Sequence, residues 1–153
     1  MDQWNGGMME YTKRRNLNRG YVKLEVWVDA IQLFVRVDRI LRETSDVEVR
    51  LRGQILDSAE SVSANIAEGY CRRTINEYLY FLNVSLGSLG ELMTRMVGLR
   101  ETQRLGVSSF ESFDEFHYKV ENKLLASIRS LQAKRREGSW EEEIRESCHP
   151  YVT

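Results

Sequence analysis

The chain has 153 residues, the usual size of one domain, with 42% hydrophobic and 29% charged residues. Its net charge of −1 and its sequence pI of about 6.2 differ from the lysine- and arginine-rich composition of a dedicated nucleic-acid-binding protein. It contains no apolar run of membrane-spanning length, no recognisable signal peptide, and only two cysteines, which lie far apart at Cys71 and Cys148. We therefore expect a cytoplasmic domain with reduced cysteines.

The first 20 residues are polar, and their basic residues include Arg14, Arg15 and Arg19. We interpret this segment as a flexible arm. From Tyr21 onward, apolar residues recur every three or four positions, as they do on one face of an amphipathic helix. The spacing predicts a first helix over residues 22–43, whose core face carries Leu24, Trp27, Val28, Ile31, Phe34, Val35 and Leu41.

A second helix is predicted after the polar residues Thr44, Ser45 and Asp46, each of which can cap a helix N-terminus. Glu48 would then lie in the first turn, where its negative charge suits the helix dipole. We expect this helix to end at Gly69, because glycine readily takes the left-handed conformation that commonly ends a helix. Its apolar positions are Leu51, Ile55, Ala59, Val62 and Ile66.

The start of a third helix is predicted from Thr74 and Glu77, which fit a capping box. In this motif the hydroxyl and the carboxylate satisfy backbone N–H groups reciprocally. The helix is expected to run to Leu105, with Gly106 as its glycine C-cap. Its apolar positions are Tyr78, Leu82, Leu86, Leu89, Met93, Met96 and Val97.

Ser108 and Glu111 predict a second capping box and a fourth helix that ends at about Arg136. The remaining residues, 137–153, form an acidic tail. No strand-like alternation occurs, and the connections between the predicted helices are short. Short connections place successive helices antiparallel. The sequence therefore predicts an all-α domain over residues 21–136: an antiparallel, up-down-up-down four-helix bundle.

Three glycines, Gly87, Gly90 and Gly98, lie inside the predicted third helix, where each costs about 1 kcal/mol relative to alanine. A helix tolerates this cost where another helix must approach its backbone closely. We therefore expect a close crossing, either within the bundle or between subunits; simple tolerance of glycine is the alternative. The consecutive large residues Tyr78–Leu82 place apolar surface around the helix, which predicts a homo-oligomer.

The sequence offers little for catalysis. Neither His117 nor His149 occurs in a metal-ligand pattern, and we interpret both as packing or surface residues. Cys71 lies near arginines and a helix N-terminus, an environment that can activate a thiol, although a small residue tolerated in a loop is the simpler interpretation. We predict no catalytic residue, cofactor or metal ligand.

The carboxylates around the second and third helices have structural interpretations, since the Glu-x-x-His motif of di-metal bundles is absent from the sequence. Glu77 is expected to cap its helix. Glu68 lies where the helix dipole disfavours a negative charge, so we expect it to pair with Arg72 or Arg73. Glu91 follows an apolar run and needs an arginine or another hydrogen-bond partner.

Basic residues cluster in the N-terminal arm, between the second and third helices, and at the end of the fourth. Repeated around an oligomer, these clusters would form a ring of positive potential that can hold phosphates. A solvated face is the alternative for each cluster taken alone. The candidate contacts with nucleic acid or a partner are Arg14, Arg15, Arg19, Arg72, Arg73, Lys134, Arg135 and Arg136.

Residues 54–92, QILDSAESVSANIAEGYCRRTINEYLYFLNVSLGSLGEL, resemble the 23S rRNA intervening-sequence protein family, also called the four-helix bundle protein family. The likeness extends over about residues 22–130. The chain differs from the usual pattern at Leu56 and Asp57, where the family often has two arginines. The residues that match the family motif are Asn65, Glu68, Gly69, Glu77, Gly87, Ser88 and Glu91.

This resemblance implies a homopentamer. A related group, the accessory variability determinants of diversity-generating retroelements, binds a reverse transcriptase and nucleic acid through basic surfaces. The resemblance therefore implies a non-enzymatic accessory protein that binds RNA or DNA, a reverse transcriptase, or both, with no cofactor, membrane or small-molecule substrate. The acidic pI leaves open a second hypothesis, a scaffold for protein–protein interaction that has no nucleic-acid partner.

Overall fold

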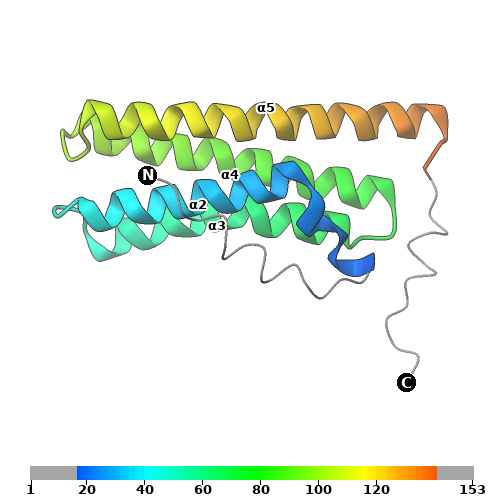
Figure 1. Ribbon diagram of the computed structural model, residues 1–153, viewed down its shortest axis with the longest axis horizontal. Helices are drawn as coiled ribbons and strands as arrows, with labels where there is room; N and C mark the ends of the chain where they lie inside the picture. Colours follow the sequence, from blue (N-terminus) through cyan, green and yellow to red (C-terminus); the bar gives the residue numbers. More distant parts are fainter. Residues whose placement is uncertain (1–16, 141–153) are drawn as a thin grey trace, which may run out of the picture.

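The computed structural model describes residues 17–140 (Figure 1). Within this range the chain forms a 3-10 helix, η1 (Leu17–Lys23), and four long α-helices that lie side by side and are joined by short loops. The predicted all-α bundle is therefore confirmed, and its helical part begins at Leu17 rather than at residue 21. The α-helices are α2 (Glu25–Glu43), α3 (Val49–Tyr70), α4 (Ile75–Glu101) and α5 (Val107–Glu137).

The four α-helices form a square in cross-section. Helix α2 packs against α3 and α5, and α4 packs against the same two helices, so α2 and α4 lie diagonally opposite each other. The pair α3 and α4 is the most extensive, and η1 packs across α2 and α3. The outer faces of α2 and α4 are consequently on opposite sides of the bundle.

The core face of α2 differs from the predicted one. Ala30, Leu33 and Val37 are fully buried, whereas Trp27 and Phe34 are only half-buried. The predicted stripe followed the largest side chains, but these lie on the flank of α2, beside small residues of α3. The buried face of α2 comprises Val26, Asp29, Ala30, Leu33, Val37 and Leu41.

The start of α3 also differs from the prediction. Its N-cap is Glu48, which makes no capping hydrogen bond through its side chain, so Glu48 precedes the first turn and Thr44–Asp46 do not cap α3. Instead, Thr44 ends α2 and donates its hydroxyl hydrogen bond to the carbonyl oxygen of Ile40, at 2.7 Å. Arg52 of α3 reaches back to the carbonyl oxygens of Leu41 and Thr44. These bonds satisfy carbonyl groups that the end of a helix leaves without an intrahelical partner.

Gly69 lies inside α3, which continues to Tyr70, so the predicted left-handed glycine cap is wrong. The reason for glycine is steric. A Cβ atom at this position would lie 2.9 Å from Cδ2 of Tyr78 and 3.1 Å from the carbonyl oxygen of the same residue. Gly69 therefore permits the close approach of α3 and α4 next to the turn that joins them.

The capping box of α4 is confirmed. The backbone N–H of Glu77 donates to Oγ1 of Thr74 at 3.2 Å, and the backbone N–H of Thr74 donates to Oε2 of Glu77 at 3.3 Å. The other end of α4 lies at Glu101, not at Leu105. There Gln103 takes a left-handed conformation, with φ of 61°, and the chain forms a Schellman motif without glycine.

Gly106 is the N-cap of α5, not the C-cap of α4. It has no side chain to cap the helix, and the predicted capping box of Ser108 and Glu111 is wrong because α5 already begins at Val107. The glycine that ends a helix in a left-handed conformation is Gly138, with φ of 65°, directly after α5.

Candidate nucleic-acid interface

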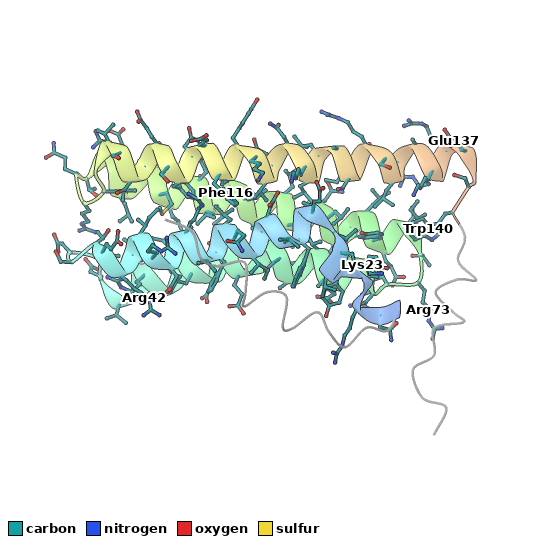
Figure 2. All side chains as sticks on the ribbon, in the orientation of Figure 1. Lys23, Arg42, Arg73, Phe116, Glu137 and Trp140 are labelled. Atoms are coloured by element: carbon teal, nitrogen blue, oxygen red, sulfur yellow. The ribbon has the colours of Figure 1, made fainter. Side chains whose placement is uncertain are left out.

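Basic segments that are far apart in the sequence lie towards the same end of the bundle, where Figure 2 labels Lys23, Arg73 and the last residue of α5, Glu137. Lys23 ends η1, Arg73 lies in the turn between α3 and α4, and Lys134–Arg136 lie in the last turn of α5. Lys23 was not among the residues predicted from the sequence, because it stands alone there. We call this surface the basic end: it comprises Arg19, Lys23, Arg72, Arg73, Lys134, Arg135 and Arg136.

Direct contacts hold these segments together. The thiol of Cys71 donates a hydrogen bond to the carbonyl oxygen of Asn18, at 3.4 Å, and this bond links the α3–α4 turn to η1. Arg135 donates through Nη1 to Oδ1 of Asn76, at 3.1 Å, and links the end of α5 to the first turn of α4. The basic end is therefore a structured surface formed by η1, the α3–α4 turn and α5.

The cations at this surface differ in their local contacts. Arg72 forms an ion pair with Glu68, as predicted, and its guanidinium lies 4.7 Å from the centre of the Phe81 ring. These contacts orient Arg72. By contrast, Arg73, Lys134 and Arg136 are exposed and form no ion pair with any carboxylate of residues 17–140. Their charges are therefore available to an anionic partner.

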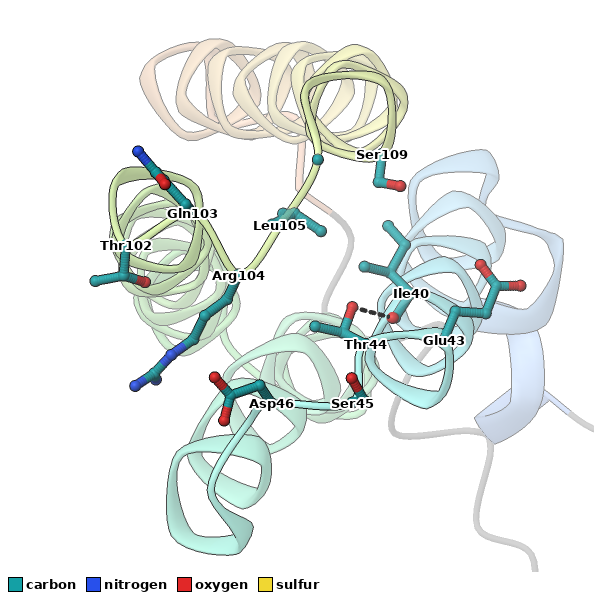
Figure 3. Close-up of a pocket in the computed structure, with 11 residues that line it drawn as sticks. Ile40, Glu43, Thr44, Ser45, Asp46, Thr102, Gln103, Arg104, Leu105 and Ser109 are labelled. Atoms are coloured by element: carbon teal, nitrogen blue, oxygen red, sulfur yellow. Dashed lines mark hydrogen bonds between the residues drawn. The ribbon is translucent and has the colours of Figure 1, made fainter.

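Three acidic side chains lie on the segments of the basic end: Glu68, Glu77 and Glu137, which is exposed and ends α5 directly after Arg136. Glu68 is paired with Arg72, and Glu77 caps α4. The opposite end of the bundle has a mixed character, because its open pocket of about 720 Å³ is lined by Glu43 and Asp46 as well as by Arg104 (Figure 3). The opposite end, which also carries Arg39, Arg50 and Arg100, therefore mixes charges of both signs, whereas the seven cations of the basic end outnumber the carboxylates of the same segments.

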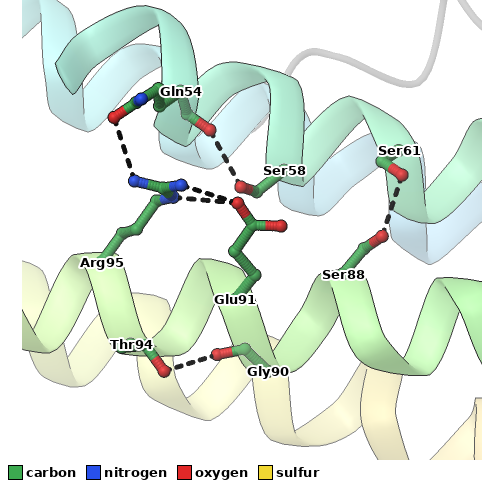
Figure 4. A network of polar contacts seen from close by, with 8 residues as sticks. All are labelled: Gln54, Ser58, Ser61, Ser88, Gly90, Glu91, Thr94 and Arg95. Atoms are coloured by element: carbon green, nitrogen blue, oxygen red, sulfur yellow. Dashed lines mark hydrogen bonds and ion pairs between the residues drawn. The ribbon is translucent and has the colours of Figure 1, made fainter.

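One family-motif residue of α4, Ser88, is linked directly to Ser61 of α3 (Figure 4). Asn65 donates through Nδ2 to the carbonyl oxygen and the hydroxyl of Ser61, at 2.8 and 2.9 Å. The hydroxyl of Ser61 shares a hydrogen bond of 2.8 Å with that of Ser88, across the interface between the helices. Ser88 therefore links the two helices that precede and follow the α3–α4 turn, and Asn65 contacts its partner Ser61 from within α3.

Glu91 has an arginine partner, as expected from its position in the sequence. Arg95 donates to Oε1 of Glu91 from Nε and Nη2, at 3.1 and 2.7 Å, and from Nη1 to Oε1 of Gln54 in α3, at 3.1 Å (Figure 4). The hydrogen bonds from Arg95 lower the pKa of Glu91, against an opposing contribution from desolvation. This group of contacts, like that of Ser88, serves the packing of α3 against α4.

Residues 22–146 match the family described as 23S rRNA-intervening sequence proteins. The chain belongs to this family. Among solved structures, it is similar to a protein of unknown function from the S23 ribosomal protein family of Bacteroides thetaiotaomicron. The two are 23% identical with a TM-score of 0.62, and the match covers 67% of this chain and 97% of that one, which supports the fold. No curated protein matches this chain.

The glycines of α4 do not mark a close crossing between helices of the same bundle. Gly87, Gly90 and Gly98 are exposed, and a Cβ atom built at any of them would meet no atom within 4 Å. A crossing within the bundle is therefore wrong as an explanation of these glycines. The alternative, a crossing between subunits, stays a prediction.

The histidine considered as a catalytic candidate within the described residues, His117, is part of the packed core. His117 is buried, packs against Phe113 and donates through Nε2 to the carbonyl oxygen of Leu89, at 2.8 Å. No group of three or more histidine, cysteine or acidic side chains gathers in residues 17–140 as metal ligands would.

Over the same residues, no helix has both the length and the apolar character needed to cross a membrane. Arg14, Arg15 and His149 lie outside the described residues.

Proposed function

We propose that this member of the 23S rRNA-intervening sequence family is a non-enzymatic accessory protein that assembles into an oligomer and binds nucleic acid, alone or together with a reverse transcriptase. The observation that carries this proposal is the convergence of three basic segments at one end of the bundle. Arg73, Lys134 and Arg136 are exposed there and form no ion pair with a carboxylate of residues 17–140. Such cations favour phosphate binding, because neutralising phosphates releases their condensed counterions.

The proposal is tested by measuring the binding of labelled RNA and DNA as a function of salt concentration. Reversing three charges together, in R73E/K134E/R136E, is expected to weaken binding at about 50 mM salt by about tenfold or more. The slope of log K against log salt should become shallower by about 3, one for each lost phosphate contact.

A matched control reverses three arginines near the other end of the bundle, in R39E/R50E/R100E. It changes the net charge equally but leaves the basic end intact. An equal loss of affinity in both variants would show a general effect of net charge, which contradicts the proposed site. The absence of binding to either nucleic acid at about 50 mM salt would contradict the nucleic-acid function altogether.

The outer face of α4 supports the assembly part of the proposal. Tyr80, Asn83, Gly87, Gly90, Thr94 and Val97 are exposed and recur at alternating spacings of three and four, the pattern of a helix-packing seam. None of these side chains is charged. Asn83 and Thr94 donate hydrogen bonds to carbonyl oxygens of their own helix, at 2.9 and 2.8 Å, so their polar groups already have partners if the face is buried.

A second, largely apolar surface lies between α2 and α3, with Glu60 as the one charged residue of its lining. Trp27, Ile31 and Phe34 of α2 and the small residues Ala64 and Ala67 of α3 line a groove of about 350 Å³. Because α2 and α4 are diagonally opposite, this groove and the α4 seam point in different directions. Two unlike surfaces suit a head-to-tail interface, which closes into a ring when the rotation between subunits allows.

We propose the homopentamer that the family resemblance implies, with the basic ends repeated around the ring. Light scattering of the full chain at micromolar concentration is expected to give about five times the 17.9 kDa mass of one chain. A monomeric mass would contradict the assembly.

A scaffold for protein–protein interaction is the second candidate function. It is favoured by the overall charge of −1, by the largely apolar groove beside α2 and by the uncharged outer face of α4. This function predicts an intact oligomer that binds neither RNA nor DNA. The binding and light-scattering measurements together therefore separate the two functions.

A further inference from the structure

The chain turns back onto the bundle directly after α5. Gly138 takes a left-handed conformation, and the backbone N–H of Ser139 donates to the carbonyl oxygen of Lys134, at 3.1 Å. Trp140 then packs half-buried against Tyr78 of α4, with the ring centres 6.1 Å apart. Figure 2 shows Trp140 at the same end of the bundle as Arg73. The C-terminal segment therefore starts beside the basic end.

The residues that follow are strongly acidic. Residues 141–146 read Glu-Glu-Glu-Ile-Arg-Glu, so four carboxylates begin immediately after the Trp140 anchor. Six residues span at most about 20 Å, which keeps the whole segment near its starting point. A short tether of this kind gives an effective concentration in the millimolar range. The carboxylates of residues 141–146 are thus tethered close to the cations of the basic end of the same chain.

We propose that residues 141–146 bind the basic end in the absence of nucleic acid and compete there with phosphate groups. This inference rests on the proposed function of the basic end and adds its regulation. The contacts would be made by Arg73, Lys134 and Arg136, which are exposed and form no ion pair with a carboxylate of residues 17–140. Exposed ion pairs are individually weak and are screened by salt, so a phosphate backbone with several charges can displace the segment.

The first test removes the charges of the segment in E141Q/E142Q/E143Q/E146Q. The matched control, E43Q/E48Q/E101Q/E111Q, removes four carboxylates at the opposite end and changes the net charge equally. With a labelled 20-nucleotide single-stranded RNA at about 50 mM salt, the segment variant is expected to bind about tenfold more tightly than the unmodified chain, and the control within about twofold. Equal affinities of the two variants would overturn the proposal.

A second test needs no nucleic acid, because the chain carries a natural reporter pair. Cys71 lies exposed in the basic end, and Cys148 follows the acidic segment by two residues. A disulfide forms only when the two Cα atoms come within about 7 Å of each other. We expect mild oxidation with diamide to form an intramolecular Cys71–Cys148 disulfide, several-fold faster in the unmodified chain than in the four-glutamine segment variant.

Non-reducing electrophoresis distinguishes the outcomes of this second test. A compact monomer band that forms faster in the unmodified chain supports the proposal. Equal rates in the unmodified chain and the segment variant, or disulfide-linked dimers in place of the compact monomer, would overturn it. If no variant binds RNA but the monomer band forms as expected, the proposed nucleic-acid function fails while the contact between the segment and the basic end stands.

Discussion

Gly53 and Gly69 are the same residue type in the same helix, yet their surroundings differ. A Cβ atom at Gly53 would meet no atom within 4 Å, whereas one at Gly69 would press against Tyr78 and Phe81 of α4. Sequence patterns predicted Gly69 as a left-handed cap because that is a frequent role of glycine at the end of a helix. The true reason for glycine lies in a neighbouring helix, which a local pattern does not contain.

The two glycines predict opposite effects of one substitution. Gly53→Ala is expected to stabilise the protein by up to about 1 kcal/mol, through helix propensity alone. Gly69→Ala should destabilise it by about 1–3 kcal/mol, because the added methyl group overpacks the α3–α4 contact. Urea unfolding followed by circular dichroism, at one fixed protein concentration, measures both changes. Equal stability of the two variants would refute the steric role of Gly69.

At the scale of the element, α2 shows the limit of hydrophobic periodicity. The sequence placed Trp27 and Phe34 in the core, but the buried face instead includes Asp29. Asp29 is accommodated because Lys119 and Lys123 of α5 approach its carboxylate. Periodicity predicts where a helix lies along the sequence, whereas the choice between two apolar faces depends on the partners that the neighbouring helices provide.

The contact between Asp29 and Lys123 predicts a measurable contribution to stability. Asp29→Asn is expected to destabilise the protein by about 1–3 kcal/mol, because it removes the charged partner of Lys123 from a largely buried position. The exposed pair of Asp38 and Arg42 on the same helix is the control, and Asp38→Asn should change stability by less than about 1 kcal/mol. Denaturant unfolding at neutral pH measures both, and equal losses would contradict a special role of Asp29.

The same contact sets a dependence on pH. The hydrogen bond from Lys123 to Asp29 raises the pKa of Lys123 above its ordinary value of 10.5, although desolvation opposes this change. A raised pKa stabilises the folded state below the unfolded pKa, and this contribution is lost as pH rises through the folded pKa. The unmodified chain should therefore lose stability above about pH 10.5 more steeply than Lys123→Met does.

At the scale of the whole molecule, the fold places basic residues that are far apart in the sequence at the same end of the bundle. The turn at Arg73 and the last turn of α5 are about 60 residues apart, but Arg135 and Asn76 are joined by a hydrogen bond. Every basic residue of this end except Lys23 was predicted from the sequence as a candidate contact. The sequence did not supply their common location, because that depends on the alternating directions of the helices and on the packing of η1 across α2 and α3.

The seam on α4 yields a prediction for the assembly. G87L/G90L leaves the isolated bundle folded, since both positions open onto free space and leucine is the better helix former. In the assembly, the two side chains would hold the neighbouring subunit away from the α4 backbone, so light scattering should give the mass of a monomer. Gly53→Leu serves as the control and should keep the oligomer. An unchanged mass for G87L/G90L would place the interface elsewhere.

The sequence by itself determined the all-α class, the succession of four long helices and the capping box of Thr74 and Glu77. These features depend on residues within a few turns of each other, where periodicity and capping chemistry act directly. Only the tertiary structure decided which face of α2 is buried, why residue 69 is glycine, and where the basic segments meet. Each of these depends on contacts between residues of different helices, and their positions follow from how the helices pack rather than from any local pattern.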